Sequence, residues 1–244
     1  MVMKKGFWII LCMFFIPPVT FAGNMKLHYD RPAEYFEEAL VIGNGTMGAT
    51  LYGGVKKDKI SFNDITLWTG EPESENSSPD AFNTIPEIRA LLDNEDYQGA
   101  DKAQYKVQGH YSENYQPLGT LTIEYLDDTI GISDYHRWLD IGNATARTQY
   151  LKGGKLFTSD YFASAPDSVI VIRLKSENKE GIYALLSFDS PLPHSSQVAD
   201  NEISVEGYAA YHSFPVYYKA EDKHRYDPER GIHFKTLVRV LSVD

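Results

Sequence analysis

Residues 144–162, ATARTQYLKGGKLFTSDYF, decide the fold class of this 244-residue chain. Two runs that alternate apolar and polar side chains, 144–151 and 155–162, flank the tetrad Lys152-Gly153-Gly154-Lys155. Glycines supply the positive φ angles that a two-residue hairpin turn demands. The stretch therefore predicts an antiparallel β-hairpin.

The same alternation recurs along most of the chain. Met47 to Leu51 and Ile60 to Phe62 predict a second hairpin around a turn at Lys56-Lys57-Asp58. Further strands are predicted at 118–125, 168–174, 182–188, 202–208 and 232–241. Because about ten to fifteen residues separate successive strands, we expect a mainly β protein, a large antiparallel β-sandwich or super-sandwich.

One region breaks this pattern and predicts two or three short inserted helices. Thr84-Ile85-Pro86-Glu87 combines an N-cap threonine with a glutamate three residues later, which is typical of a helix start. A second helix is predicted from Glu95 to about Val107, with Tyr97, Ala100 and Ala103 on one face. The polar segment 71–80 before them reads as a surface loop.

The N-terminus has the three-part layout of a secretory signal. Lys4 and Lys5 precede an apolar run at 7–16, and Thr20-Phe21-Ala22 supplies small residues at the −3 and −1 positions. The run has about half of the roughly 20 residues that span a bilayer, and Pro17-Pro18 ends it. We therefore expect residues 1–22 to be a signal peptide, with no stable membrane span and a periplasmic or extracellular mature protein.

Cysteine content and charge limit the partners of the mature chain. Cys12, the only cysteine, lies in the predicted leader, so the mature domain contains no disulfide and depends on its core. Lipidation of Cys12 is disfavoured because the preceding Leu11 is not small. The formal charge of −11 repels phosphate backbones, so nucleic acid is not an expected partner.

Familiar catalytic motifs are absent from the sequence. It contains no Gly-rich phosphate loop, no His-Glu-x-x-His and no Gly-x-Ser-x-Gly. The seven histidines are scattered from His28 to His233 without metal-ligand spacing. We therefore predict no metal site and no cofactor, and spacing alone singles out no pair of carboxylates for acid–base work.

Three segments combine amides, carboxylates and an indole in a way that suits sugar recognition. They are 37–48, 63–70 and 115–121. Sugars offer hydroxyls to polar side chains and an apolar C–H face to aromatic rings. Each residue taken alone is also explained by a turn or by core packing. The candidates are Asn44, Asn63, Trp68 and Gln116.

The order and spacing of these segments resemble the N-terminal domain of glycoside hydrolase family 95, whose best-known members are inverting α-L-fucosidases. The resemblance covers nearly the whole mature chain through 27–40, 43–45, 52–55, 63–70, 85–89, 116–119, 135–140 and 162–167. It implies a β-sandwich that is followed, in full-length members, by a linker and an (α/α)₆ barrel carrying both catalytic carboxylates. Two or three helices cannot build that barrel, so no catalytic residue is carried over.

The resemblance sets the expected domain, partners and site. Residues 23–244 are expected to form the N-terminal sandwich, truncated at its C-terminal edge because the last strand stops without a turn. The implied partners are the missing barrel and fucosylated or galactosylated glycans, with Asn44, Asn63, Trp68 and Gln116 at the cleft or domain interface. A free-standing carbohydrate-binding module and a non-functional pseudogene product remain the alternatives.

Overall fold

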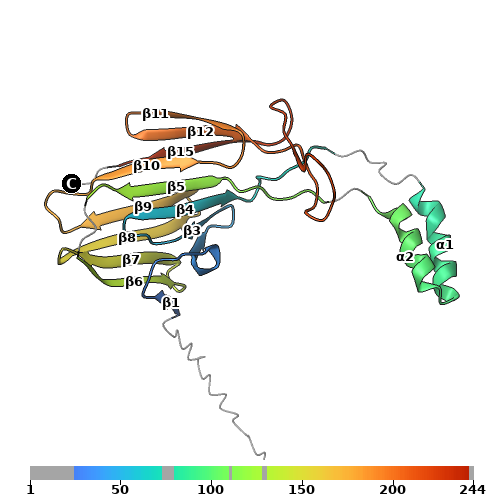
Figure 1. Cartoon of the computed structure of the whole chain (residues 1–244), viewed down its shortest axis with the longest axis horizontal. Coiled ribbons are helices and arrows are strands. Elements are labelled where there is room, and N and C mark those ends of the chain that lie inside the picture. Colours follow the sequence, from blue (N-terminus) through green and yellow to red (C-terminus); the bar gives the residue numbers. More distant parts are fainter. Residues whose placement is uncertain (1–24, 73–79, 110–111, 128–130, 242–244) are drawn as a thin grey trace, which may run out of the picture.

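The computed structural model of the chain describes residues 25–72, 80–109, 112–127 and 131–241 (Figure 1). The expected signal peptide at 1–22 and most of the predicted loop at 71–80 lie outside these residues. Within the described ranges, no helix is both long and apolar enough to span a bilayer.

Two five-stranded antiparallel sheets form the body of the molecule. The first has the order β1 (Lys26–Tyr29), β6 (Ile132–Asp140), β7 (Thr145–Lys152), β8 (Lys155–Ser164) and β9 (Val169–Ser176). The second has the order β10 (Ala184–Asp189), β5 (Gly119–Tyr125), β4 (Lys57–Asp64), β3 (Met47–Leu51) and β2 (Leu40–Gly43).

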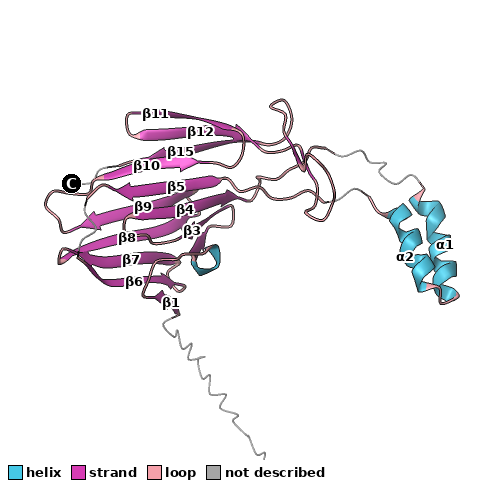
Figure 2. Cartoon of the chain, in the orientation of Figure 1, coloured by secondary structure: helices cyan, strands magenta, loops and turns pink. Residues whose placement is uncertain are grey.

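Two smaller sheets complete the β structure (Figure 2). A three-stranded sheet has the order β11 (His194–Ala199), β12 (Glu202–Tyr208) and β15 (His233–Arg239). A two-stranded sheet pairs β13 (His212–Ser213) with β14 (His224–Arg225). The strand predictions at 118–125, 168–174, 182–188, 202–208 and 232–241 are confirmed by β5, β9, β10, β12 and β15.

The hairpin predicted from residues 144–162 is confirmed. Strands β7 and β8 pair in register from Thr145 opposite Phe162 to Lys152 opposite Lys155. Gly153 and Gly154 form the turn with φ angles of 56° and 76°. Positive φ at both central residues defines the type I′ geometry that matches strand twist.

The inner faces of the two large sheets share one apolar core. Buried side chains of β2 to β5 and β10 meet those of β7 and β8, and Val205 of β12 joins them. At its centre Tyr150 stacks on Phe157 with ring centroids 5.0 Å apart, and Tyr125 meets Phe157 edge-on at 5.2 Å. Face-to-face burial of alternate residues confirms the predicted β-sandwich.

The turn predicted at Lys56-Lys57-Asp58 is corrected by Asp58, whose side chain is buried. The turn was expected at Lys56 to Asp58, but β4 already begins at Lys57. Asp58 points inward and accepts hydrogen bonds from the Gly54 amide at 2.8 Å and the Tyr161 hydroxyl at 2.8 Å. Burial raises the pKa of Asp58 to about 6. A polar residue such as Asp58 indicates a turn in the sequence, whereas its hydrogen bonds hold its side chain in the core.

A buried arginine ties the N-terminal segment to the sandwich. Arg137 of β6 donates from Nε to the Arg31 carbonyl and from Nη1 to the Glu38 carbonyl, both at 2.8 Å. Its guanidinium lies 4.2 Å from the centroid of the Tyr29 ring. Burial lowers the pKa of Arg137. These contacts hold the segment containing the short 3-10 helix η1 (Phe36–Glu38) against the first sheet.

Two helices are inserted between β4 and β5 and form an arm that projects from the sheets (Figures 1 and 2). They are α1 (Ala81–Asp93) and α2 (Tyr97–Gln104), followed by the 3-10 helix η2 (Tyr105–Val107). In the second helix, Asp96 caps the N-terminus by accepting from the Gly99 amide at 2.8 Å. Ala100 and Ala103 are buried as predicted.

The predicted start of the first helix is wrong. Helix α1 begins at Ala81, so Thr84 is no N-cap: its hydroxyl donates back to the Asp80 carbonyl at 3.0 Å inside the first turn. Tyr97, expected on one face with Ala100 and Ala103, is the first residue of α2 and is 66% exposed. The two helices pack on each other.

Candidate functional site at the helical end of the sandwich

Two chain segments continue the β4–β5 pairing beyond the sheet and lead to the arm. We call residues 65–72 and 112–118 the neck. The Thr69 amide donates to the Asn114 carbonyl and the Gln116 amide to the Leu67 carbonyl, both at 2.8 Å. A β-bridge between Trp68 and Tyr115 lies between these hydrogen bonds. The neck is therefore an ordered extension of the sandwich.

The neck displays an apolar patch. Trp68 and Tyr115 meet edge-on with centroids 6.3 Å apart, and the Trp68 indole donates to the Ile65 carbonyl at 2.8 Å. Trp68 is 43% exposed, whereas its neighbour Leu67 is buried in a small core with Leu192 and Ala209. Core packing therefore does not explain Trp68, whose ring is available to a sugar or to another domain.

Gln116 lies beside this patch but does not share its exposure. Its backbone belongs to the neck ladder, and its side chain is buried, with Nε2 3.5 Å from the Tyr115 carbonyl. The structure thus brings Trp68 and Gln116 onto adjacent segments. Of these two, only Trp68 presents its side chain to the surface.

Asn44 is committed to the β2–β3 turn. Its Oδ1 accepts from the amides of Thr46 at 3.1 Å and Met47 at 2.8 Å. Its Nδ2 donates to the Ser164 carbonyl at 2.9 Å, which links the second sheet to the first. The side chain is fully occupied by the fold, so its observed contacts are those of a turn residue.

Asn63 differs from Asn44 because part of its amide is unused. It lies on β4 opposite Gly48, near the neck. Its Oδ1 is buried and has no hydrogen-bond partner among the described residues. Buried polar atoms normally have partners, so this oxygen is an unsatisfied acceptor inside the fold, and its burial keeps it from the surface. Both asparagines lie at the neck end of the second sheet, where the Ile65 amide also bonds the Thr46 carbonyl at 2.8 Å.

A polar cluster that the sequence did not reveal locks the neck to the β13–β14 region. The Glu113 carboxylate accepts from the Thr69 hydroxyl, from His212 Nδ1 at 2.7 Å and from the Ser213 amide at 3.2 Å. The Ser213 hydroxyl lies 2.9 Å from His224 Nδ1. Glu113 and His212 are 99 residues apart in sequence, and no local motif marks their contact.

A second ion pair completes this connection. Arg230 bonds both carboxylate oxygens of Glu71 and lies 3.6 Å over the Tyr211 ring. The Arg230 hydrogen bond lowers the pKa of Glu71. These contacts, together with a bond from the Gly70 amide to the Ala210 carbonyl, hold residues 210–231 against the neck.

Two carboxylates line a hollow of about 410 Å³ at the neck, and both are held by hydrogen bonds. The lining residues are Thr69, Gly70, Glu71, Pro72, Glu113, Gly231 and Ile232. An inverting glycosidase needs one carboxyl that stays protonated as a general acid. Arg230 instead favours the ionised form of Glu71, and Glu113 is surrounded by three donors. In the described ranges, no group of three or more potential metal ligands lies close enough to hold an ion.

The antiparallel sandwich, with its helical insertion and its polar and aromatic neck, is a β-sandwich domain that matches a glycosyl hydrolase N-terminal domain. The chain belongs to the family described as glycosyl hydrolase family 65, N-terminal domain, whose model matches residues 27–244. The resemblance to the N-terminal domain of an α-L-fucosidase-type hydrolase is thereby confirmed.

The similar proteins are α-fucosidases. The chain is 31% identical over 223 residues to α-L-fucosidase 2 of Arabidopsis thaliana, covering 88% of this chain and 26% of that protein. It is 29% identical over 211 residues to probable α-fucosidase A of Aspergillus niger, covering 81% of this chain and 26% of the relative. The chain thus spans about a quarter of the length of these relatives.

Proposed function

We propose that this chain is the non-catalytic N-terminal domain of an exported, inverting glycoside hydrolase that cleaves α-L-fucosides of glycans. The observation that supports the non-catalytic role is the set of contacts made by Glu71 and Glu113, since both carboxylates of the neck hollow are held by hydrogen-bond donors of the domain itself. The substrate class is supported by the names of the relatives, which are α-fucosidases. An α-galactoside is the second substrate class that the family resemblance allows.

The domain's task in this proposal is to dock and support a catalytic barrel at the neck end. The neck exposes Ile65, Trp68 and Tyr115, and the arm exposes Phe82, which is 83% accessible. Contiguous exposed apolar side chains mark surfaces that bind other proteins or domains. These features support a role in docking or lining the cleft for Trp68, while Asn44 and Gln116 support the fold behind it. Asn63, whose Oδ1 is buried, stays a candidate from the family resemblance.

Hydrolysis of a chromogenic α-L-fucoside tests the proposal. The purified 244-residue chain is expected to show no turnover. The same chain joined to the polypeptide encoded downstream of Asp244 is expected to be active with inversion at the anomeric carbon. Turnover by the 244-residue chain alone would overturn the non-catalytic role.

The downstream DNA also separates this proposal from its alternatives. A continuation that encodes the helices of a barrel supports the domain role. A stop codon followed by an unrelated gene, together with sugar binding by the soluble chain, would instead support a free-standing carbohydrate-binding module.

A further inference from the structure

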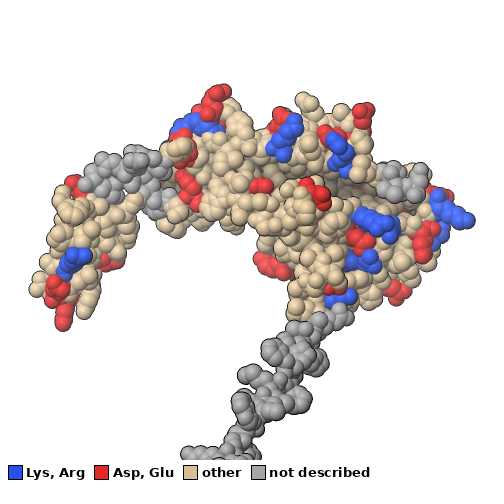
Figure 3. Space-filling model, turned by 180° about the vertical axis from the view of Figure 1, so that it is seen from behind, with Lys and Arg blue, Asp and Glu red and all other residues tan. Residues whose placement is uncertain are grey.

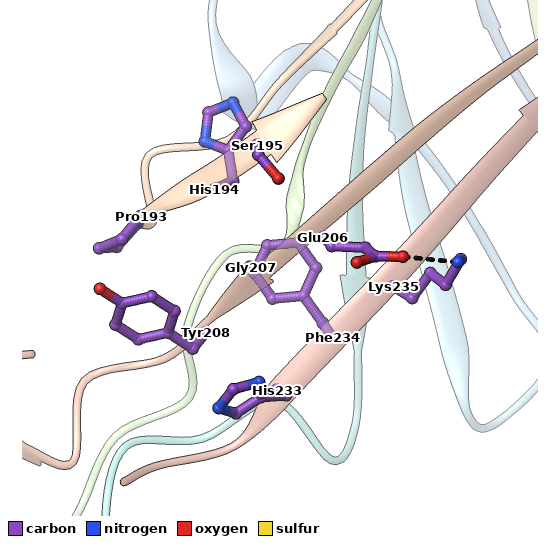
Figure 4. Close-up of a pocket in the computed structure, with 9 residues that line it drawn as sticks. All are labelled: Pro193, His194, Ser195, Glu206, Gly207, Tyr208, His233, Phe234 and Lys235. Atoms are coloured by element: carbon purple, nitrogen blue, oxygen red, sulfur yellow. Dashed lines mark hydrogen bonds and ion pairs between the residues drawn. The ribbon is translucent and has the colours of Figure 1, made fainter. Parts of the chain in front are cut away.

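A second hollow, of about 640 Å³, lies on the three-stranded sheet and shares no residue with the neck hollow. Figure 4 shows the residues that line it. They form three columns across the sheet, and each column contains one residue from β11 or the position just before it, one from β12 and one from β15. The columns are Pro193, Tyr208 and His233, then His194, Gly207 and Phe234, and finally Ser195, Glu206 and Lys235. The strand register places the members of each column beside one another.

The register also shows which columns face outward. Val205, Ile203, Phe234 and Val238 pack against the main core, so their side chains point inward. Successive side chains of a strand point to opposite faces. Two columns therefore project from the outer face, and the middle column lies between them. We call this hollow, with its six outward residues Pro193, Ser195, Glu206, Tyr208, His233 and Lys235, the outer groove.

One wall of the outer groove is aromatic and well supported. The rings of Tyr208 and His233 stack with centroids 5.8 Å apart at 29°, and Tyr226 meets Tyr208 edge-on at 6.5 Å. His233 Nε2 lies 2.9 Å from the Pro228 carbonyl. Because a carbonyl only accepts, Nε2 carries the hydrogen of this bond, and Nδ1 is left for a further hydrogen bond. This wall is thus an apolar surface edged by hydrogen-bonding atoms.

The opposite wall is polar but electrically balanced. Lys235 Nζ lies 2.5 Å from Glu206 Oε1, and Ser195 is the neighbour of Glu206 on β11. The pair leaves the second carboxylate oxygen and further ammonium hydrogens able to bond a ligand. Because the charges cancel, the groove favours a neutral ligand over an anion or a cation.

We propose that the outer groove binds a neutral pyranose unit of a glycan. The C–H face of the sugar lies on the Tyr208 and His233 rings, while neighbouring hydroxyls donate to Glu206 and accept from Lys235 and Ser195. No bond is broken at this site. The proposed function enters only in the choice of fucosylated and galactosylated probes.

Isothermal titration of the 244-residue chain with 2′-fucosyllactose and with lactose tests the outer groove. We expect a dissociation constant of about a millimolar for at least one probe. Tyr208→Ala is expected to weaken binding about tenfold because the stacking surface is lost, whereas Tyr208→Phe retains most of it. Glu206→Gln is an exposed second variant that leaves the sheet packing alone and is expected to weaken binding several-fold.

Tyr97→Ala is the matched control, because it removes an exposed aromatic ring from the arm and leaves the outer groove and the neck intact. It should bind like the unmodified chain. The proposal is overturned if neither probe binds at about ten times the expected dissociation constant of about a millimolar. It is also overturned if Trp68→Ala, which removes the exposed ring of the neck, abolishes binding while Tyr208→Ala and Glu206→Gln do not. Hydrolysis of a fucoside by the chain alone would contradict the proposed function and leave the result for the groove unchanged.

Discussion

Asp58 and Arg137 are charged side chains that the sandwich buries in its interior. Each is held by hydrogen bonds to backbone or hydroxyl groups, and neither forms an ion pair among the described residues. Removing charge from water is costly, and for a carboxyl the cost favours the protonated form. The protonation of Asp58 therefore makes the stability of the fold depend on pH.

The stability of the domain is expected to fall as Asp58 ionises. Its pKa of about 6 in the folded chain lies above the ordinary value of 3.8, so the neutral carboxyl stabilises the fold. This contribution is fully present below about pH 4 and is lost as the pH rises through 6. A difference of about two pKa units corresponds to about 3 kcal/mol. Urea unfolding between pH 4 and 7.5 measures it, with Asp58→Asn lacking this part of the decline.

Asp222→Asn is the matched control for this measurement. Asp222 is exposed, so the variant should follow the pH dependence of the unmodified chain. Parallel curves for Asp58→Asn and the unmodified chain would contradict an influence of Asp58 on pH-dependent stability.

At the scale of elements, local chemistry made some features predictable. Two glycines between alternating runs fixed the β7–β8 hairpin, because turn geometry and strand period agree within one short segment. The strand β11 was missed because its side chains are all exposed, and an exposed strand has no apolar alternation to detect. The start of α1 was misplaced because Thr84 uses its hydroxyl inside the helix.

The site was less predictable than the fold for a physical reason. Trp68 and Gln116 were chosen from separate segments, and the neck does bring those segments together. The Glu113–His212 and Glu71–Arg230 contacts join residues 99 and 159 positions apart. Such contacts depend on how the sheets pack, and no spacing in one sequence encodes them. The outer groove could not be predicted for the same reason, because its residues come together only through the register of β11, β12 and β15.

The arm is expected to be dispensable for folding of the sandwich. The helices α1, α2 and η2 pack mainly on one another, and the Thr69–Asn114 bond closes the neck without them. Replacing residues 73–109 by a short Gly/Ser linker should shift the thermal midpoint by less than about 4 °C. Calorimetry measures this midpoint.

Leu67→Ala is the positive control, because it shows whether calorimetry detects a loss of stability at the neck. Leu67 is buried, so its truncation should cost about 2–5 kcal/mol and lower the midpoint clearly. Loss of a cooperative transition in the linker variant would show instead that the arm is part of the folding unit.

Charge is a property of the molecule as a whole. The net charge is −11, and Figure 3 shows acidic and basic side chains interspersed on the face it presents. That nucleic acid is not a partner stays a prediction, which rests on the repulsion between this net charge and a phosphate backbone.

Export is a further proposal at this scale, and the processed N-terminus tests it. If residues 1–22 act as a signal peptide, the mature chain begins at Gly23. N-terminal sequencing of protein recovered from the periplasm or the medium should give Gly-Asn-Met-Lys. Replacing Ala22 with a bulky residue should block this cleavage, whereas a mature protein that still begins at Met1 would contradict export by this route.

The insertion of the arm between two directly paired strands has a consequence for how such domains diversify. β4 and β5 are neighbours in the sheet, and the neck keeps the two ends of the insertion hydrogen-bonded together. Doubling the length of a flexible connection costs only about 0.6 kcal/mol. Evolution, or a protein engineer, can therefore exchange the arm for another module at this junction, and so change which partner the scaffold recruits while inheriting the sandwich unaltered.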